Sequence, residues 1–298
     1  WFPNKNVVIR KNLLEGVPGD GIVPVGCDGA LIEYNVMRDC PRLLPEGEAA
    51  AGIWPWSSDN TIIQYNEVSD HKAPWDAQGF DSDWNCRNTL IQYNYSHDNE
   101  GGFLLICNDG GASKSSSVGN TGSIIRYNLS VNDGLRNIGK HKGFSPVIHI
   151  AGPVRNTRVY NNVIYITKKA PGVDSSVINI TDWKGFADST VFANNIFYAA
   201  AEVKYLLSKG NRTIFENNIY YGTHLNKPED SFAVLHNPAF AIKEPLGAPG
   251  LKSAENFKIS KNSPAIGMGK MMDSRQVKDF FGNTVETDKP SIGLHQVN

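Results

Sequence analysis

The segment NTIIQYNEV, residues 60–68, and the segment NTLIQYNYS, residues 88–96, together decide the fold. In both, an apolar run with β-branched and aromatic residues ends in an Asn. The same pattern occurs eight times, at Asn12, Asn35, Asn66, Asn94, Asn128, Asn162, Asn195 and Asn218. Subtracting these positions gives steps of 23, 31, 28, 34, 34, 33 and 23 residues. A fixed core unit with inserts of variable length is typical of a solenoid, whose repeats bury their apolar faces only against neighbours.

Each repeat is short and rich in strand-forming residues, with no sustained apolar period of 3.6 residues. This pattern predicts one coil of a parallel β-helix rather than a pair of helices. Such coils need Gly or Asn to turn the backbone, often at positive φ, and an inward Asn can hydrogen-bond the turn amides of adjacent coils. We therefore expect an all-β domain with coils over residues 1–230. Residues 231–298 are less repetitive and are expected to cap the open end of the solenoid.

The composition fits a single soluble domain of extracellular type. The 298 residues are 40% hydrophobic and 20% charged, and the net charge of −1 predicts no strong attraction to nucleic acid or membranes. No apolar run reaches transmembrane length. The chain opens at Trp1 almost directly in a strand, so we expect a processed or truncated product. Four cysteines without zinc spacing are expected as small buried side chains rather than disulfides: Cys27, Cys40, Cys86 and Cys107.

A second strand can be stacked from coil to coil. Its texts are GIVPVGC from Gly21, GIWPWSS from Gly52, GFDSDWN from Gly79, GFLLICN from Gly102, VIHIAGP from Val147 and VINITDW from Val177. Strand alternation then predicts two outward columns. The first runs Val23, Trp54, Asp81, Leu104, His149, Asn179, and the second runs Val25, Trp56, Asp83, Ile106, Ala151, Thr181.

These columns place Trp54 and Trp56 one rung, about 4.8 Å, from Asp81 and Asp83. An exposed indole is a natural partner for the apolar face of a sugar ring. The alternative is that long inserts fold over both Trp residues and bury them. His149 lies two rungs beyond the aspartates and is a further candidate for the catalytic site, where it would orient a carboxyl or hydroxyl group of the sugar.

The segment WDAQGFDSDWN, residues 75–85, carries the strongest chemical signal. Asp81 and Asp83 share a face with Cα atoms about 6.6 Å apart, which suits a general acid and a water-activating base. Like-charge repulsion would raise one pKa, as a general acid requires. Asp76 is a third candidate, and Trp75 and Trp84 would hold the sugar. Calcium chelation, or plain solvation and turn capping, remains open for the same aspartates.

Other polar residues are expected along the same groove. His71, Glu100 and Asn179 are candidates for substrate contacts, each with an alternative role in a turn or strand. The basic insert RNIGKHKGF, residues 136–144, leads into the His149 strand. It either contacts an acidic sugar or is a solvated loop.

The Asn column, the Gly-led strands and the tail resemble bacterial right-handed parallel β-helix proteins of the pectate-lyase-like superfamily. Residues 4 to about 222 carry the resemblance, and the tail texts SPAIGMG (263–269), DFFGN (279–283) and PSIGLHQ (290–296) are similar to the ending of secreted members. The resemblance implies a single-stranded right-handed β-helix and carbohydrate cleavage by hydrolysis or β-elimination, although the superfamily also has non-catalytic members. Because no GHG or RIK text is present, it does not imply a polygalacturonase.

Three functions follow as hypotheses. A glycoside hydrolase would use the carboxylates as acid and base, without a cofactor. A polysaccharide lyase would neutralise a uronic acid with Ca²⁺ or a basic side chain and use Lys140, His141 or His149 as the base. A non-catalytic glycan-binding solenoid needs only the Trp groove. We expect the hydrolase, acting on a polysaccharide or oligosaccharide, in a secreted, periplasmic or cell-surface protein.

Overall fold

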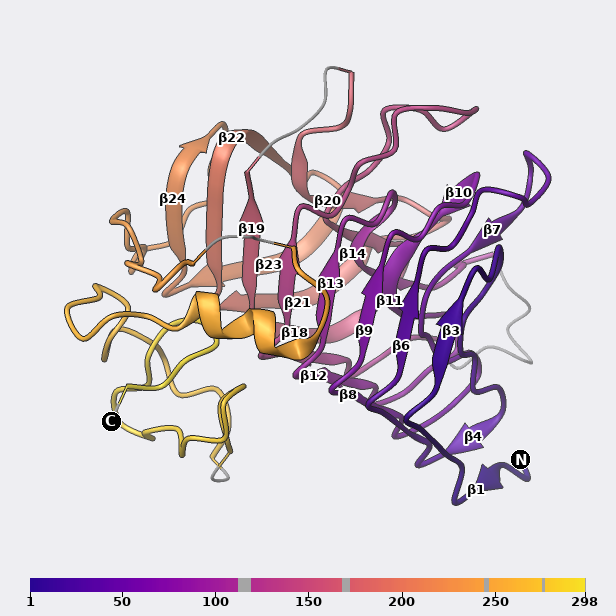
Figure 1. Ribbon diagram of the computed structural model, residues 1–298, viewed down its shortest axis with the longest axis horizontal. Coiled ribbons are helices and arrows are strands. Elements are labelled where there is room, and N and C mark those ends of the chain that lie inside the picture. Colours follow the sequence, from indigo (N-terminus) through magenta and orange to yellow (C-terminus); the bar gives the residue numbers. More distant parts are fainter. Residues whose placement is uncertain (112–118, 168–171, 244–246, 275–276, 298) are drawn as a thin grey trace.

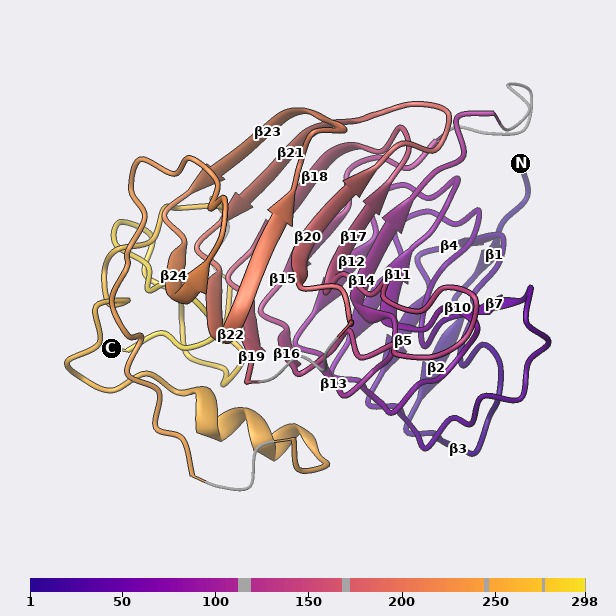
Figure 2. The same ribbon diagram turned by 90° about the horizontal axis from the view of Figure 1, so that it is seen from above.

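The computed structural model describes residues 1–111, 119–167, 172–243, 247–274 and 277–297. In these residues the chain winds as a parallel β-helix, and every pairing between its named strands is parallel (Figure 1). The coils contribute strands to three faces, which we call the first, second and third sheets, and four coils have a strand in the third. Figure 2 shows equivalent strands of successive coils running side by side along the solenoid.

The first sheet has eight strands in the order of the coils. They are β2 (Val8–Arg10), β5 (Leu31–Glu33), β8 (Ile62–Gln64), β12 (Leu90–Gln92), β15 (Ile124–Arg126), β18 (Arg155–Tyr160), β21 (Ala187–Ala193) and β23 (Gly210–Glu216). Their central side chains point into the solenoid, and Ile32, Ile63, Ile91 and Ile125 are fully buried in one column. Burying each such side chain contributes roughly 1.5–3 kcal/mol, and only stacked coils can supply this burial.

The second and third sheets join into one twelve-stranded hydrogen-bonded sheet. The second sheet holds β3 (Leu13–Glu15), β6 (Val36–Arg38), β9 (Glu67–Ser69), β13 (Tyr95–His97), β16 (Leu129–Val131), β19 (Val163–Ile166), β22 (Ile196–Leu206) and β24 (Ile219–His224). The third sheet holds β11 (Gln78–Ser82), β14 (Gly102–Cys107), β17 (Ile148–Ala151) and β20 (Ser176–Thr181). The long strand β22 pairs with β19 at its start and with β20 at its end, so it connects the two faces.

The remaining elements are short. Strand β1 (Asn4–Lys5) pairs with β4 (Cys27–Asp28), β7 (Ala49–Ala50) pairs with β10 (Trp75–Asp76), and η1 (Leu251–Phe257) is a 3₁₀ helix. All four cysteines are buried and free, as expected.

The predicted Asn ladder is confirmed in all eight coils. The side-chain amide of each ladder Asn donates to the Oδ1 of the Asn in the next coil over 2.8–3.1 Å. The same Oδ1 also accepts the backbone N–H of the Asn that donates to it, as Asn35 does for Asn12. The ladder ends where the Asn218 amide donates to the Asp230 carboxylate. The expectation that Gly or Asn turns the backbone is confirmed in three coils and wrong in the other five. The left-handed residue is the one before the ladder Asn, and it is an Asn in three coils but Lys or Tyr in the rest: Lys11, Tyr34, Tyr65, Tyr93, Tyr127, Asn161, Asn194 and Asn217.

The C-terminal segment extends the solenoid by one bridge, Val234 to Ile219, and then covers the flank of the second sheet. There Phe257, Ile292 and Leu294 pack with buried side chains of β13, β16 and β19. The segment, yellow in Figure 1, gathers around the end of the solenoid that carries β24. The segment packs there because β13, β16 and β19 present apolar side chains outward, and its role as a cap of the open end stays a prediction.

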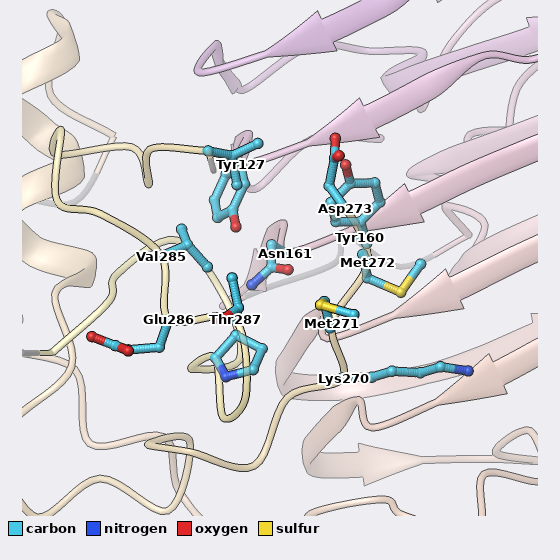
Figure 3. Close-up of a pocket in the computed structure, with 12 residues that line it drawn as sticks. Tyr127, Tyr160, Asn161, Lys270, Met271, Met272, Asp273, Val285, Glu286 and Thr287 are labelled. Atoms are coloured by element: carbon cyan, nitrogen blue, oxygen red, sulfur yellow. The ribbon is translucent and has the colours of Figure 1, made fainter. Parts of the chain in front are cut away.

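A small pocket lies in the seam between this segment and the coils (Figure 3). Tyr127 and Tyr160 of the coils face Met271, Met272 and Thr287 across it. Its volume is about 20 Å³, which is room for about one water molecule. The seam is therefore a packing joint and not a site for a sugar.

Candidate active site

The outward face of the third sheet carries the candidate site. The predicted stacking is confirmed where Ile22 bridges to Ile53 and Ile53 to Phe80, so that Trp54 and Trp56 lie opposite Asp81 and Asp83. It is confirmed again where β17 pairs with β20 and His149 lies opposite Asn179.

The predicted register of β14 was wrong by one residue. Phe80 pairs with Leu104, not with Phe103, because β14 begins with Gly102 opposite Gln78. Leu104 and Ile106 are therefore fully buried in the core, and Leu105 and Cys107 take the outward positions. This shift brings a thiol rather than an aliphatic side chain beside Asp83.

A cleft of about 290 Å³ opens over β11, β14, β17 and β20. Its lining consists of Trp75, Asp76, Asp83, Leu105, Cys107, His149, Ala151, Thr181, Asp182 and Trp183. The floor between the acidic end and Thr181 is apolar, since Leu105, Cys107 and Ala151 form a small cluster. A cavity of this size and mixed polarity matches small-molecule or single-sugar binding sites.

Three carboxyl groups are coupled at the acidic end of the cleft. Burial, followed by the charges of Asp76 and Asp83, raises the pKa of Asp81 well above its usual range. Burial and then the charge of Asp83 raise the pKa of Asp76 to about 7. Asp20 is a fourth carboxyl group on the N-terminal side, and its charge also raises both pKa values. Asp81 is 2% exposed, and its Oδ1 has no hydrogen-bond partner among the described residues.

Asp83 differs from its neighbours because donors hold its carboxylate. The backbone N–H of Trp84 and the thiol of Cys107 both donate to its Oδ1, at 2.5 and 2.8 Å. Burial raises its pKa, but these two hydrogen bonds oppose the shift. Its backbone carbonyl accepts the side-chain amide of Asn120 at 3.0 Å. Asp83 is therefore the carboxylate best stabilised in its charged form.

Asp76 reaches the cleft from an unusual backbone. Asp76 and Ala77 lie consecutively in the left-handed region, at φ 58° and 62°. The backbone passes so close to Gly101 that a Cβ on this glycine would come within 1.6 Å of the Asp76 carbonyl oxygen. That carbonyl also accepts a hydrogen bond from the buried Arg136 guanidinium. Such strain persists only where surrounding contacts fix it, and it is concentrated at functional sites.

Aromatic rings form the two ends of the cleft. Trp75 contacts the rings of His141 and Phe144 at centroid distances of 3.9 and 5.2 Å, so the 136–144 insert supports it. The Arg136 guanidinium lies 5.7 Å from the Trp75 ring. At the other end Trp183 is 39% exposed, although its backbone carbonyl accepts the N–H of Gly110.

His149 stands on the cleft floor as a neutral imidazole. Burial lowers its pKa to about 4, and its Nε2 is 2.8 Å from the Thr181 hydroxyl. It can exchange a hydrogen bond with a substrate hydroxyl but carries no charge near neutral pH.

The other predicted Trp residues flank the cleft on its N-terminal side. The Trp54 Nε1 donates to the Asp20 carboxylate at 3.0 Å. Trp56 is 40% exposed and meets Trp84 edge to face at 5.4 Å. The loops therefore leave Trp56 open and do not bury it.

Three predicted contact residues are not brought into the cleft lining. His71 is fully buried, with its Nε2 3.0 Å from the Gly19 carbonyl. Glu100 is buried in an ion pair with Arg42. Asn179 is 8% exposed beside His149. Their roles in binding stay predictions.

Residue-by-residue alignment missed several members of the site. Trp183 continues the alternation of the VINITDW text two residues past Thr181, so extending the column would have found it. Cys107 was lost through the register error. Asp20 and Arg136 come from connecting segments, and no repeat pattern marks them. The described residues include no group of three or more His, Cys, Asp or Glu side chains arranged for a metal ion, and the calcium alternative stays a prediction.

Comparison with known proteins agrees with this architecture. Residues 1–139 match the family model described as a right-handed beta helix region. The chain is a right-handed parallel β-helix. No curated protein matches the chain. No helix in the described part is long and apolar enough to cross a membrane.

Two solved structures are similar to part of this chain. The GH136 lacto-N-biosidase from Eubacterium ramulus is 29% identical with a TM-score of 0.41, over 58% of this chain and 25% of that chain. XylC in its complex with xylose is 13% identical with a TM-score of 0.45, over 91% of this chain and 50% of that chain. This chain thus spans a quarter to a half of the length of these proteins.

Proposed function

We propose that this protein is a carbohydrate-active enzyme, a glycoside hydrolase that cleaves a polysaccharide or oligosaccharide in the third-sheet cleft. The observation that carries the proposal is the pair of carboxyl groups, Asp76 and Asp83, that line one cleft between two indoles. A sugar ring stacked on Trp75 or Trp183 would lie over the floor that these carboxyl groups border.

The electrostatics support a division of roles. Asp76, with a pKa of about 7, is partly protonated near neutral pH and suits the general acid that protonates the leaving oxygen. Asp83, whose carboxylate accepts two hydrogen bonds, suits the group that acts as a base toward water or as a nucleophile. Asp81 is buried and is not among the residues that line the cleft, and burial raises its pKa well above the usual range, so we assign it no contact with substrate.

The lyase alternative has less support. A lyase must neutralise the carboxylate of a uronic acid, and among the described residues that line the cleft none is Lys or Arg. Arg136 lies against Trp75, and His141 packs against the same indole.

We extend the proposal to a secreted or cell-surface setting, because polymeric glycans are met outside the cell.

The test is hydrolysis of a panel of plant, algal and host glycans by the wild type, Asp76→Asn and Asp83→Asn, with Asp188→Asn as the control. Asp188 is a carboxylate paired with Arg212 on the first sheet, outside the cleft lining. We expect new reducing ends without unsaturated products, and a loss of about 10²–10⁴-fold in kcat for each cleft variant.

Unchanged turnover in both cleft variants would remove these carboxyl groups from the mechanism. Unsaturated products, which absorb near 235 nm, would identify a lyase. Glycan binding without any cleavage would identify a non-catalytic binding protein.

A further inference from the structure

The thiol of Cys107 is an unusual neighbour for a carboxylate in a cleft. Cys107 is 3% exposed, lines the cleft floor and donates to the Asp83 Oδ1 at 2.8 Å. Its pKa is raised well above the usual range by burial and by the charge of Asp83, so it stays a protonated donor. Hydrogen bonding by a neutral thiol favours the charged form of the carboxylate.

We propose that Cys107 is a positioning residue that keeps Asp83 ionised and fixes its orientation, so that Asp83 and not Asp76 serves as the charged partner. This inference rests on the proposed hydrolase function. Cys107 contacts no reacting atom in this scheme and acts only through Asp83.

The surroundings of Asp83 explain why a donor is needed there. The titratable groups around it come from its own strand and the neighbouring segments: Asp81, Asp76, Asp20, Cys86, Cys107 and, elsewhere in the cleft lining, His149 and Asp182. None of them is a cation near neutral pH. Without a donor, burial and then repulsion from Asp20 would drive Asp83 toward its neutral form.

Among the described residues, two donors oppose this tendency, the Trp84 N–H and the Cys107 thiol. The Trp84 N–H belongs to the backbone and is present with any side chain at position 84. The Cys107 thiol is thus the donor that a side-chain substitution can remove. A Ser at position 107 would retain a donor, whereas Ala or Val would not.

Two measurements test this on the full chain. Infrared titration of the carboxyl band, assigned by subtracting the spectrum of Asp83→Asn, follows the protonation of Asp83 without substrate. The pH profile of kcat/KM on a glycan that the wild type cleaves follows its role in turnover. The variants are Cys107→Ala, Cys107→Val, which fills the space without a donor, and Cys107→Ser. The matched control is Cys86→Ala, because Cys86 is also buried near Asp83 but donates to the Pro55 carbonyl instead.

We expect the Asp83 midpoint to move to higher pH in Cys107→Ala and Cys107→Val, and to stay near the wild-type value in Cys107→Ser and Cys86→Ala. The acidic limb of kcat/KM should move in the same direction, because a base is lost when it is protonated. Unmoved midpoints in both donor-free variants, an equal shift in Cys86→Ala, or an unmoved acidic limb would overturn the proposal. A shifted infrared midpoint in a protein that cleaves no glycan would overturn the hydrolase function while supporting the control of Asp83 by Cys107.

Discussion

The Asn ladder and the aspartate cluster are two sets of polar side chains held on successive rungs of one solenoid. In the ladder every amide finds partners, so that Asn128 donates to Ile91, Arg126 and Asn162 and accepts from Asn94. In the cluster the groups are all acceptors when ionised, and Asp81 retains a buried oxygen without a partner among the described residues.

The same stacked backbone therefore stabilises the fold where it carries amides and forms a candidate catalytic site where it carries carboxyl groups. An amide carries both donor and acceptor, so stacked amides satisfy one another and stabilise the fold. Stacked carboxylates repel, so their pKa values rise and one of them must hold a proton. Stability therefore comes from the corner between the first and second sheets, and chemistry from the outward face of the third sheet.

The largest effect should come from breaking the ladder. Asn128→Ala removes several buried hydrogen bonds and leaves buried backbone groups unpaired, so we expect it to lower the free energy of unfolding by about 3–5 kcal/mol. Denaturant unfolding measures this, with the exposed Asn262→Ala as a control expected to change stability by less than about 0.5 kcal/mol. Equal effects of the two substitutions would contradict a structural role for the ladder.

In the aspartate cluster, by contrast, we expect a substitution to raise the free energy of unfolding. A carboxyl group whose pKa is raised on folding destabilises the protein increasingly as the pH rises from its unfolded pKa to its folded pKa. For Asp76 this window runs from about 4 to about 7. Asp76→Asn should therefore gain on the order of 3 kcal/mol of stability relative to wild type between pH 4 and pH 8. Melting temperatures across this range measure the difference, and a constant difference would show that Asp76 titrates normally.

The backbone beneath Asp76 allows a smaller test. Gly101→Ala should cost about 2 kcal/mol and displace Asp76, because its Cβ would overlap the Asp76 carbonyl oxygen. Gly47→Ala is a suitable control, since nothing lies within 4 Å of the Cβ position there. We expect activity to fall in the Gly101 variant even below its melting temperature. A stable, fully active Gly101→Ala protein would contradict the close approach.

The smallest effect is expected at the far end of the cleft. Trp183→Ala should raise KM by about fivefold and leave kcat almost unchanged, because loss of ring stacking costs about 1 kcal/mol of binding. Phe186→Ala is the matched control, an exposed aromatic three residues away that does not line the cleft. Steady-state kinetics on an oligosaccharide distinguishes them. A fall in kcat alone would show that Trp183 acts on the reaction and not on binding.

The sequence predicted most of the third-sheet face, and its errors have local causes. Asp81, Asp83 and His149 were placed on one face by alternation, and the structure agrees. The failure at β14 came from treating Gly102 as equivalent to Gly79, since one additional residue reverses inward and outward positions along a strand. His71 and Glu100 were proposed from their nearness in sequence, but their side chains turn into buried contacts.

By itself the sequence determined the solenoid, because its information is local and periodic: a recurrent Asn after apolar β-forming residues specifies the same corner in every coil. It also determined which residue types gather on the outward face. Only the tertiary structure decided the ionisation of the carboxyl groups, the closing of the cleft between Trp75 and Trp183, and the approach of Asp20, Cys107 and Arg136. These depend on burial and on distances through space between segments far apart in the chain, and no repeat pattern encodes such distances.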